Sequence, residues 1–490
     1  MISLGPKYGY LPKPEKTVLL FKHPDDVRQA NAIFENTGIK LKLDGHRYLG
    51  AALGTQAFKE SFVKEKVKKW VDDILELSEI AIDNPQIALT AYTKGICHRW
   101  AYIQRTIGGI SNLFTPLEEC IKETFLPSVI GRKVSDAERK IFSLPVRYGG
   151  LGVANPVETC EREFHSSLTI TEDLTGLIYR QEQDFSLFNA ERQSLVIKEL
   201  KATKENSNKE ILNGIISLTE DQSLKRALTL NKEKGSGTWL TVLPLESHGY
   251  CLNKREFRDA LSIRYGWNVP NMPPFCGCGQ RNSIDHTLIC KKGGYVFMRH
   301  NNLRDLNADL QREVCRDVVV EPSLLPLSNE DVQGAQGDRA GPDISSRGLW
   351  STFERTFYDV RVLHPNAPSY LNKDLPTLYR SHEQEKLRTY NSRVMTVERG
   401  SFTPLIYTTF GGWGPLASRY HKRLAEKLAI KRNEQYSHVL NHMRARIRFS
   451  LLRSVLIAVR GERGKRQPTP RPLSTTSFNL VPDAQDYESL

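Results

Sequence analysis

The chain has 490 residues, of which 39% are apolar and 26% are charged, and its formal net charge is +13. This length and balance are typical of roughly two to four globular domains and exclude general disorder. The positive charge favours an acidic macromolecule, such as nucleic acid, as the partner. The sequence has no secretory signal and no apolar run of roughly eighteen residues, so we expect no membrane association and a location in the nucleus or cytoplasm.

The first 158 residues change from a strand pattern to a helical one. Two stretches within 1–57, "YGYLPKPEKTVLLF" and "GIKLKLDGHRYLGAALG", predict short strands around a short helix. From Phe58 onward, apolar residues recur at spacings of three and four, and the glycine-rich "LPVRYGGLGVANP" ends this pattern. We therefore predict a helical domain at 58–158, followed by a helical connector at 159–270.

Cysteine usage points to one metal site rather than to a disulfide framework. Of the eight cysteines, five are scattered singly and three lie close together beside a histidine, with the spacing C-x-C-x7-H-x3-C. This pattern can supply four ligands to a structural zinc ion. The predicted knuckle at 271–298 has as its ligands Cys276, Cys278, His286 and Cys290. Coincidental cysteines are the alternative, because most zinc motifs open with C-x2-C.

The segment "TFYDVRVLHPNAPS" places a carboxylate, Asp359, in the middle of a strong strand pattern. Alternation predicts that three neighbours share its strand face, namely Phe357, Arg361 and Leu363. A second acid stands sixteen residues earlier in the dipeptide Pro342-Asp343. Two carboxylates on neighbouring strands can hold one or two Mg²⁺ or Mn²⁺ ions against a scissile phosphate, although each acid alone is more often a turn or edge residue.

Such a metal site usually includes a cation that offsets the charge of the phosphate. Arg361 lies on the predicted face of Asp359, but a guanidinium does not release a proton near neutral pH. Lys386 is the better candidate, because Lys386 and Tyr390 are four residues apart on one face of a predicted helix, with Glu383 one turn earlier. A solvated helix face is the alternative interpretation of this pair.

Positive charge gathers near the end of the chain. Residues 419–471 hold fifteen Lys and Arg against three Asp and Glu, and we predict a basic helical segment at 431–472. This surplus is expected to bind a phosphate backbone, with a solvated basic helix as the alternative. The expected nucleic-acid contacts are Arg361, Lys422, Arg423, Arg444, Arg446 and Arg448. The last stretch, 473–490, has no periodicity and is expected to be disordered.

The order of these segments resembles the C-terminal half of non-LTR retrotransposon polyproteins that carry a restriction-like endonuclease. The shared order is a Cys/His knuckle, a helix, PD-x15-D on strands and K-x3-Y on a helix. The resemblance implies a PD-(D/E)XK nuclease domain at 299–430, whose lysine has moved from the strand to the following helix. Two metal-binding acids, a catalytic lysine, its companion tyrosine and a helix acid would then be Asp343, Asp359, Lys386, Tyr390 and Glu313.

The N-terminal half extends this resemblance. "GYLPKPEKTVLLF" resembles the strand and lysine segment that follows the catalytic aspartates of a reverse transcriptase, and "GHRYLGAALG" resembles its primer-gripping hairpin. The resemblance implies a truncated palm remnant at 1–57 and a thumb at 58–158. Because Met1 lies only fifteen residues before Lys16, we expect no DNA synthesis by this chain alone, and a full-length reverse transcriptase chain could be a partner.

The expected fold is α+β and multidomain, with a palm-like β/α segment, a helical thumb and connector, a zinc knuckle and a PD-(D/E)XK α/β nuclease-like domain. The expected function is a divalent-metal-dependent endonuclease that nicks DNA, within a truncated retrotransposon reverse transcriptase protein. The alternative is a catalytically inactive remnant that binds DNA or RNA, which Arg361 in place of a strand lysine permits. A third interpretation is a purely structural domesticated protein.

Overall fold

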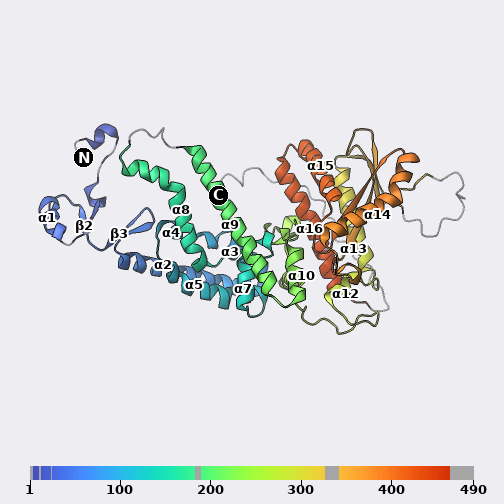
Figure 1. The fold of residues 1–490 in the computed structure, drawn as a ribbon, viewed down its shortest axis with the longest axis horizontal. Coiled ribbons are helices and arrows are strands. Elements are labelled where there is room, and N and C mark those ends of the chain that lie inside the picture. The colour runs from blue at the N-terminus through green and yellow to red at the C-terminus, as the bar shows by residue number, and fades with distance from the viewer. Residues whose placement is uncertain are drawn as a thin grey trace. The chain divides into compact units, whose positions relative to one another are not determined.

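The computed structural model describes residues 4–182, 189–325 and 341–463, apart from residues 10, 12, 22 and 24. The chain divides into two compact units: unit 1 comprises the described residues of Met1–Pro145 and Gly150–Ile215, and unit 2 comprises those of Val146–Gly149 and Ile216–Leu490. Helices predominate and the strands form small sheets, so the predicted α+β class is confirmed (Figure 1).

Unit 1 begins with two small sheets and continues as helices. Strands β1 and β2 pair in parallel, and β3 and β4 form an antiparallel hairpin. The hydroxyl of Thr55 caps helix α2 by accepting a hydrogen bond from the N–H of Phe58 at 3.3 Å. The apolar stripe of α2 is buried, and Trp70 stacks on Phe114 with the ring centroids 6.1 Å apart. The elements are β1 Val18–Leu20, α1 Asp25–Phe34, β2 Lys40–Lys42, β3 Gly45–Tyr48, β4 Ala51–Gly54, α2 Gln56–Asp83, α3 Pro85–Lys94, α4 Ala101–Thr106, α5 Thr115–Cys120, α6 Leu126–Ile130, α7 Asp136–Ser143, α8 Pro156–Tyr179 and α9 Ala190–Leu218, which runs into unit 2.

Unit 2 is built around a four-stranded sheet of order β5-β6-β7-β8. The first three strands are antiparallel neighbours, whereas β8 lies parallel to β7 and is reached through the crossover helix α14. The elements are α10 Gln222–Asn231, α11 Lys254–Tyr265, α12 Ile284–Ile289, α13 Tyr295–Arg312, β5 Arg316–Val320, β6 Ile344–Arg347, β7 Arg355–Leu363, α14 Leu375–Thr396, β8 Ser401–Thr408, α15 Pro415–Arg432 and α16 Tyr436–Arg460.

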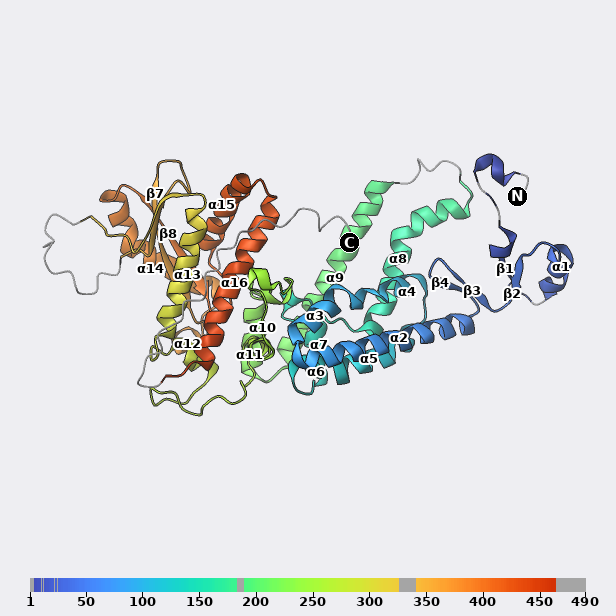
Figure 2. The same cartoon turned by 180° about the vertical axis from the view of Figure 1, so that it is seen from behind.

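The two faces of this sheet carry different helices. Tyr358 and Val360 of β7 point into a core made with α13, α15 and α16. Phe357 and Leu363 point to the opposite face, where they pack under α14. Figure 2 shows α13 and α16 in front of the sheet and α14 behind it. The predicted alternation along β7 is therefore confirmed, and Asp359 lies on the α14 face.

The compact units do not follow all of the predicted domain boundaries. The predicted connector, 159–270, is divided between the two units after Ile215. The described part of the predicted basic segment, 431–463, is mostly α16, which packs on α13 and α15 in the central core of unit 2. The predicted tail, 473–490, lies outside the described residues.

Candidate functional site

The register of β6 and β7 brings two candidate acids side by side. Ile344 pairs with Tyr358 across this antiparallel ladder. Asp343, one residue earlier, therefore lies beside Asp359, one residue later. The N–H of Asp343 donates to the carbonyl of Tyr358 at 2.8 Å, and the N–H of Val360 donates to Asp343 Oδ2 at 2.6 Å. The N–H of Val360 thus holds the Asp343 carboxylate in place just before β6.

Asp359 is buried in the middle of β7 and meets Lys386 of α14. Lys386 Nζ lies 2.9 Å from Asp359 Oδ2, and only 5% of the Asp359 side chain is exposed. Burial, together with the charge of Asp343, raises the pKa of Asp359 to about 6 against the opposing effect of Lys386. Strongly perturbed carboxylates beside a specific charged partner gather at functional sites.

The structure also brings Tyr390 to this place. Lys386 Nζ lies 5.6 Å from the centre of the Tyr390 ring, as the i, i+4 spacing predicts. Tyr390 is buried, and its ring packs against Phe402 of β8. Burial and the charges of Asp359 and Asp343 raise the pKa of Tyr390 to about 12, so its hydroxyl is neutral at physiological pH. Tyr390 is suited to packing beside the lysine rather than to accepting a proton.

A histidine that the sequence reasoning missed completes this cluster. His300, in the first half of α13, has its Nε2 atom 3.2 Å from Asp343 Oδ2. Burial acts to lower the pKa of His300, but the hydrogen bond and charge of Asp343 outweigh burial, and the net pKa is raised. The sequence showed only that His300 stands on a predicted helix before the strands. Its distance from Asp343 along the chain does not predict a contact.

Glu313, the expected helix acid, lies elsewhere. It stands at the C-terminal end of α13, where Arg432 Nη2 of α15 lies 2.6 Å from its carboxylate. His300 and Glu313 are thirteen residues apart on this helix, which corresponds to about 20 Å. The structure therefore does not bring Glu313 to Asp343 and Asp359, and Glu313 instead joins α13 to α15.

The four predicted zinc ligands do come together. The ligand atoms of Cys276, Cys278, His286 and Cys290 all lie within 4.8 Å of one another. A tight turn carries the first two cysteines, with Gly279 at a φ of 88° and its N–H donating to the carbonyl of Cys276 at 2.8 Å. Helix α12 carries the histidine. Thiolates and an imidazole at this separation suit tetrahedral zinc, so the cluster could hold a structural zinc ion.

The knuckle is joined to the sheet by side-chain hydrogen bonds. His364, in the loop after β7, has Nε2 2.9 Å from Asp285 Oδ1 of α12 and Nδ1 2.7 Å from Thr409 Oγ1 beyond β8. Arg299, beside His300 on α13, donates to the carbonyl of Leu288 at 3.2 Å. The start of the "HPNAPS" loop therefore has a definite role, which is to tie the knuckle to the ends of β7 and β8.

The basic residues expected to contact nucleic acid differ in how exposed they are in the structure. Lys422 is exposed on α15. Arg361 is partly exposed, and its Nη1 lies 2.8 Å from Glu385. Arg423 is partly buried and donates to the carbonyl of Leu349 at 3.0 Å.

The arginines of α16 are less accessible than the charge count suggested. Arg444 lies over the Trp413 ring at 5.4 Å, and Arg446 is half-buried. The prediction that Arg448 contacts nucleic acid is wrong, because only 5% of this residue is exposed. Burial and the charge of Arg264 lower the pKa of Arg448 to about 9. Counting charges along the sequence took no account of the fact that α16 is a core helix.

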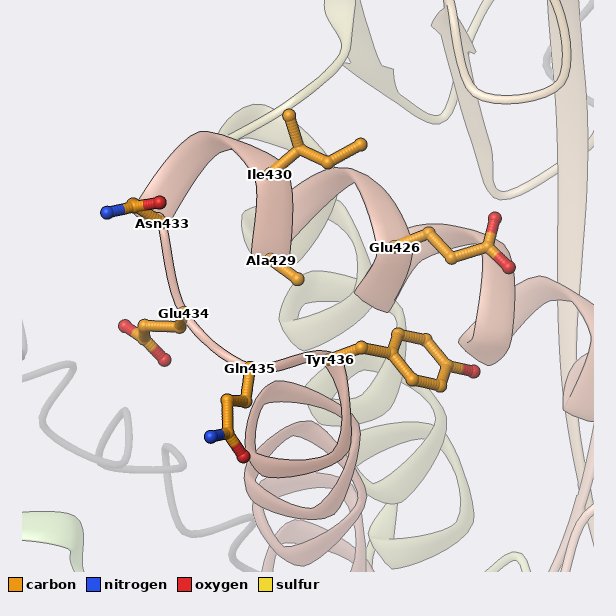
Figure 3. A pocket seen from close by; sticks show the side chains of 7 residues that line it. All are labelled: Glu426, Ala429, Ile430, Asn433, Glu434, Gln435 and Tyr436. Atoms are coloured by element: carbon orange, nitrogen blue, oxygen red, sulfur yellow. The ribbon is translucent and has the colours of Figure 1, made fainter.

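One pocket of unit 2 lies at a different place from the acid pair, although its lining residue Glu426 forms an ion pair with Arg423. Figure 3 shows it at the turn between α15 and α16, where Ile430 and Tyr436 lie near Glu426 and Glu434. None of the predicted site residues lines this pocket. Its two carboxylates make it a poor place for a phosphate.

Unit 2 therefore contains an acid pair with a lysine and a histidine, and a separate Cys/His cluster in the described residues. No described helix combines the length and the hydropathy that a bilayer crossing requires. Comparison with protein-family models and with curated protein sequences finds no match to this chain.

Proposed function

We propose that the protein is a divalent-metal-dependent DNA endonuclease that nicks one strand of its target. The observation that carries this proposal is the ion pair between Lys386 and the buried Asp359, with Asp343 beside it. A purely structural core seldom places two carboxylates next to each other on adjacent strands, because their mutual repulsion and their desolvation both destabilise the fold. A bound cation would offset the repulsion between the two carboxylates and could hold a phosphate.

The donor set suits the hard cations used in phosphodiester hydrolysis. Asp343 and Asp359 would hold Mg²⁺ or Mn²⁺, which prefer carboxylate oxygens. The bound ion would act as a Lewis acid toward the phosphate and would lower the pKa of an attacking water. Lys386 would offset the negative charge that grows on the phosphate oxygens. His300 would orient the Asp343 carboxylate, and Tyr390 would hold the lysine stem in position.

The order of segments supports an origin in a retrotransposon reverse transcriptase protein. The knuckle precedes α13, the two acids follow on β6 and β7, and the lysine follows on α14. We infer that unit 2 corresponds to the nuclease portion and that unit 1 corresponds to palm and thumb segments, with a full-length reverse transcriptase chain as a further proposed partner.

Nicking of supercoiled plasmid by the purified full chain, with Mg²⁺ or Mn²⁺, tests the proposal. We expect nicking by the parent and none by Asp359→Ala or Lys386→Ala. The matched controls are Asp309→Ala and Lys209→Ala, which remove exposed charges from helix surfaces and should nick like the parent. DNA binding by the inactive variants shows that they are folded.

Binding without nicking in either metal would overturn the endonuclease proposal. The protein would then be a catalytically inactive nucleic-acid-binding remnant. Arg361 is the feature compatible with that outcome, since it pairs with Glu385 rather than with either acid.

A further inference from the structure

Three arginines lie in one row across the sheet of unit 2. Arg316 of β5 is the register partner of Arg347 of β6. Arg347 is in turn the register partner of Arg355 of β7. Cross-strand partners in antiparallel ladders have their Cβ atoms about 5 Å apart and their side chains on the same face. Three guanidinium groups are thus held on neighbouring strands at one end of the sheet.

Such a row is unfavourable unless something anionic lies against it. Like charges directly opposite each other destabilise a sheet. Among the described residues, one acid pairs with the row: Arg347 Nε lies 3.3 Å from Asp317 Oδ2, and both of these side chains are about half exposed or more. Arg355 rests on the Phe357 ring at 5.0 Å and donates to Ser345 Oγ at 3.1 Å, both of which are uncharged. One exposed carboxylate offsets only part of three positive charges.

The row lies on the same sheet face as Asp359. Residues two apart along a strand point to the same side, so Arg355 shares its face with Asp359 on β7. Four residues separate Arg355 from Asp359, which corresponds to about 13 Å along the strand. That length is roughly four nucleotides along the axis of duplex DNA.

We propose that Arg316, Arg347 and Arg355 bind phosphates of the DNA backbone to one side of the cut, within roughly four nucleotides of the scissile phosphate. The position along the DNA rests on the proposed endonuclease function, because it is counted from Asp359. Binding itself does not depend on cleavage. The guanidinium fork suits phosphate oxygens, and two of the three residues are exposed to a ligand.

The test uses the full chain, zinc-loaded and without Mg²⁺ or Mn²⁺, and a short fluorescein-labelled DNA duplex followed by fluorescence anisotropy. The variant is Arg316→Gln with Arg347→Gln, which leaves the contacts of Arg355 intact. The control is Arg180→Gln with Arg192→Gln, which removes two exposed arginines of unit 1 that also lie in ion pairs. Affinities are measured over a range of salt concentrations.

We expect the row variant to bind about tenfold more weakly than the parent, with the slope of log affinity against log salt reduced by about 2, since each phosphate contact contributes about 0.9. The control should keep the slope of the parent. Arg316→Lys with Arg347→Lys keeps the charge and should keep most of the slope, which separates loss of phosphate contacts from misfolding. An unchanged slope in the folded Gln variant overturns the proposal.

The two proposals fail in different ways. If the Gln variant has a reduced salt slope but the parent nicks no plasmid, the arginine row is supported as a DNA-binding surface and only the endonuclease proposal is rejected. If the parent nicks plasmid but the Gln variant keeps the parent's salt slope, the arginine-row proposal is rejected and the endonuclease proposal stands.

Discussion

The Cys/His knuckle and the acid pair are both candidate metal sites of unit 2, and they are assembled in opposite ways. The knuckle takes its four ligands from fifteen consecutive residues, 276–290, and closes them around one point. The acid pair needs a strand start, the centre of another strand and two helices on opposite faces of the sheet. A closed set of soft ligands serves stability, whereas hard ligands beside a lysine leave room for a substrate.

The largest effect should come from breaking the knuckle. Cys290→Ser removes a ligand, and we expect unit 2 to lose about 5 kcal/mol or more of unfolding free energy, since structural zinc contributes its binding energy to folding. Urea unfolding and zinc content by atomic absorption measure this. Cys251→Ser, outside the knuckle, should keep its zinc. A stable Cys290→Ser protein with full zinc content would show that the four residues are not a zinc site.

Removing one acid of the pair should have the opposite effect to breaking the knuckle, lowering activity but leaving stability nearly unchanged. Asp343→Asn is expected to lower the nicking rate roughly a thousandfold, about 4 kcal/mol of transition-state stabilisation, while the unfolding free energy changes little. Plasmid nicking and urea unfolding are measured on the same preparation. Asp285→Asn is the matched control, because Asp285 also meets a histidine but belongs to the knuckle attachment. If Asp285→Asn lost as much activity as Asp343→Asn, the distinction between the two sites would disappear.

A third buried acid shows whether burial alone marks a functional carboxylate. Burial raises the pKa of Glu233 to about 7 against hydrogen bonds from Tyr379 and Thr408 and the charge of Arg448. Because the folded state holds this proton more tightly than the unfolded state, stability falls as pH rises from about 4.5 through 7, by at most about 3 kcal/mol.

Glu233→Gln should therefore match the parent near pH 4.5 and exceed its unfolding free energy by about 2 to 3 kcal/mol at pH 8, with nicking unchanged. Urea unfolding at both pH values is the measurement. The matched control is Glu426→Gln, which makes the same substitution on an exposed helix surface, loses an ion pair with Arg423 and should not gain stability. A loss of nicking in Glu233→Gln would place this acid in the functional machinery.

The smallest effect should come from Arg361, two residues beyond Asp359 on the same strand face. Its ion pair with Glu385 is partly exposed, so Arg361→Gln should cost less than about 1 kcal/mol and keep nicking within about threefold. Plasmid nicking and urea unfolding measure both. A large loss of nicking would make Arg361 part of the acid pair's machinery and would favour a strand cation over Lys386.

The difference in assembly also explains what could be predicted from the sequence. Short-range sequence spacing predicts the four knuckle ligands, the alternation along β7 and the pairing of Lys386 with Tyr390. In the structure, the knuckle ligands lie together, and Lys386 lies over Tyr390. His300 was missed because its contact with Asp343 depends on how α13 packs on the sheet. The prediction for Arg448 failed for a related reason, since burial depends on the whole fold and not on local charge.

The packing of α16 on α13 sets the order in which the chain can fold as it is synthesised. More than a hundred residues separate these two helices in the sequence, yet they form one core. If the knuckle holds a zinc ion, its four ligands are available soon after residue 290 leaves the ribosome. The sheet that carries the acid pair keeps an apolar face uncovered until α16 has been made, so a nascent chain would bind zinc well before its acid pair is held in place.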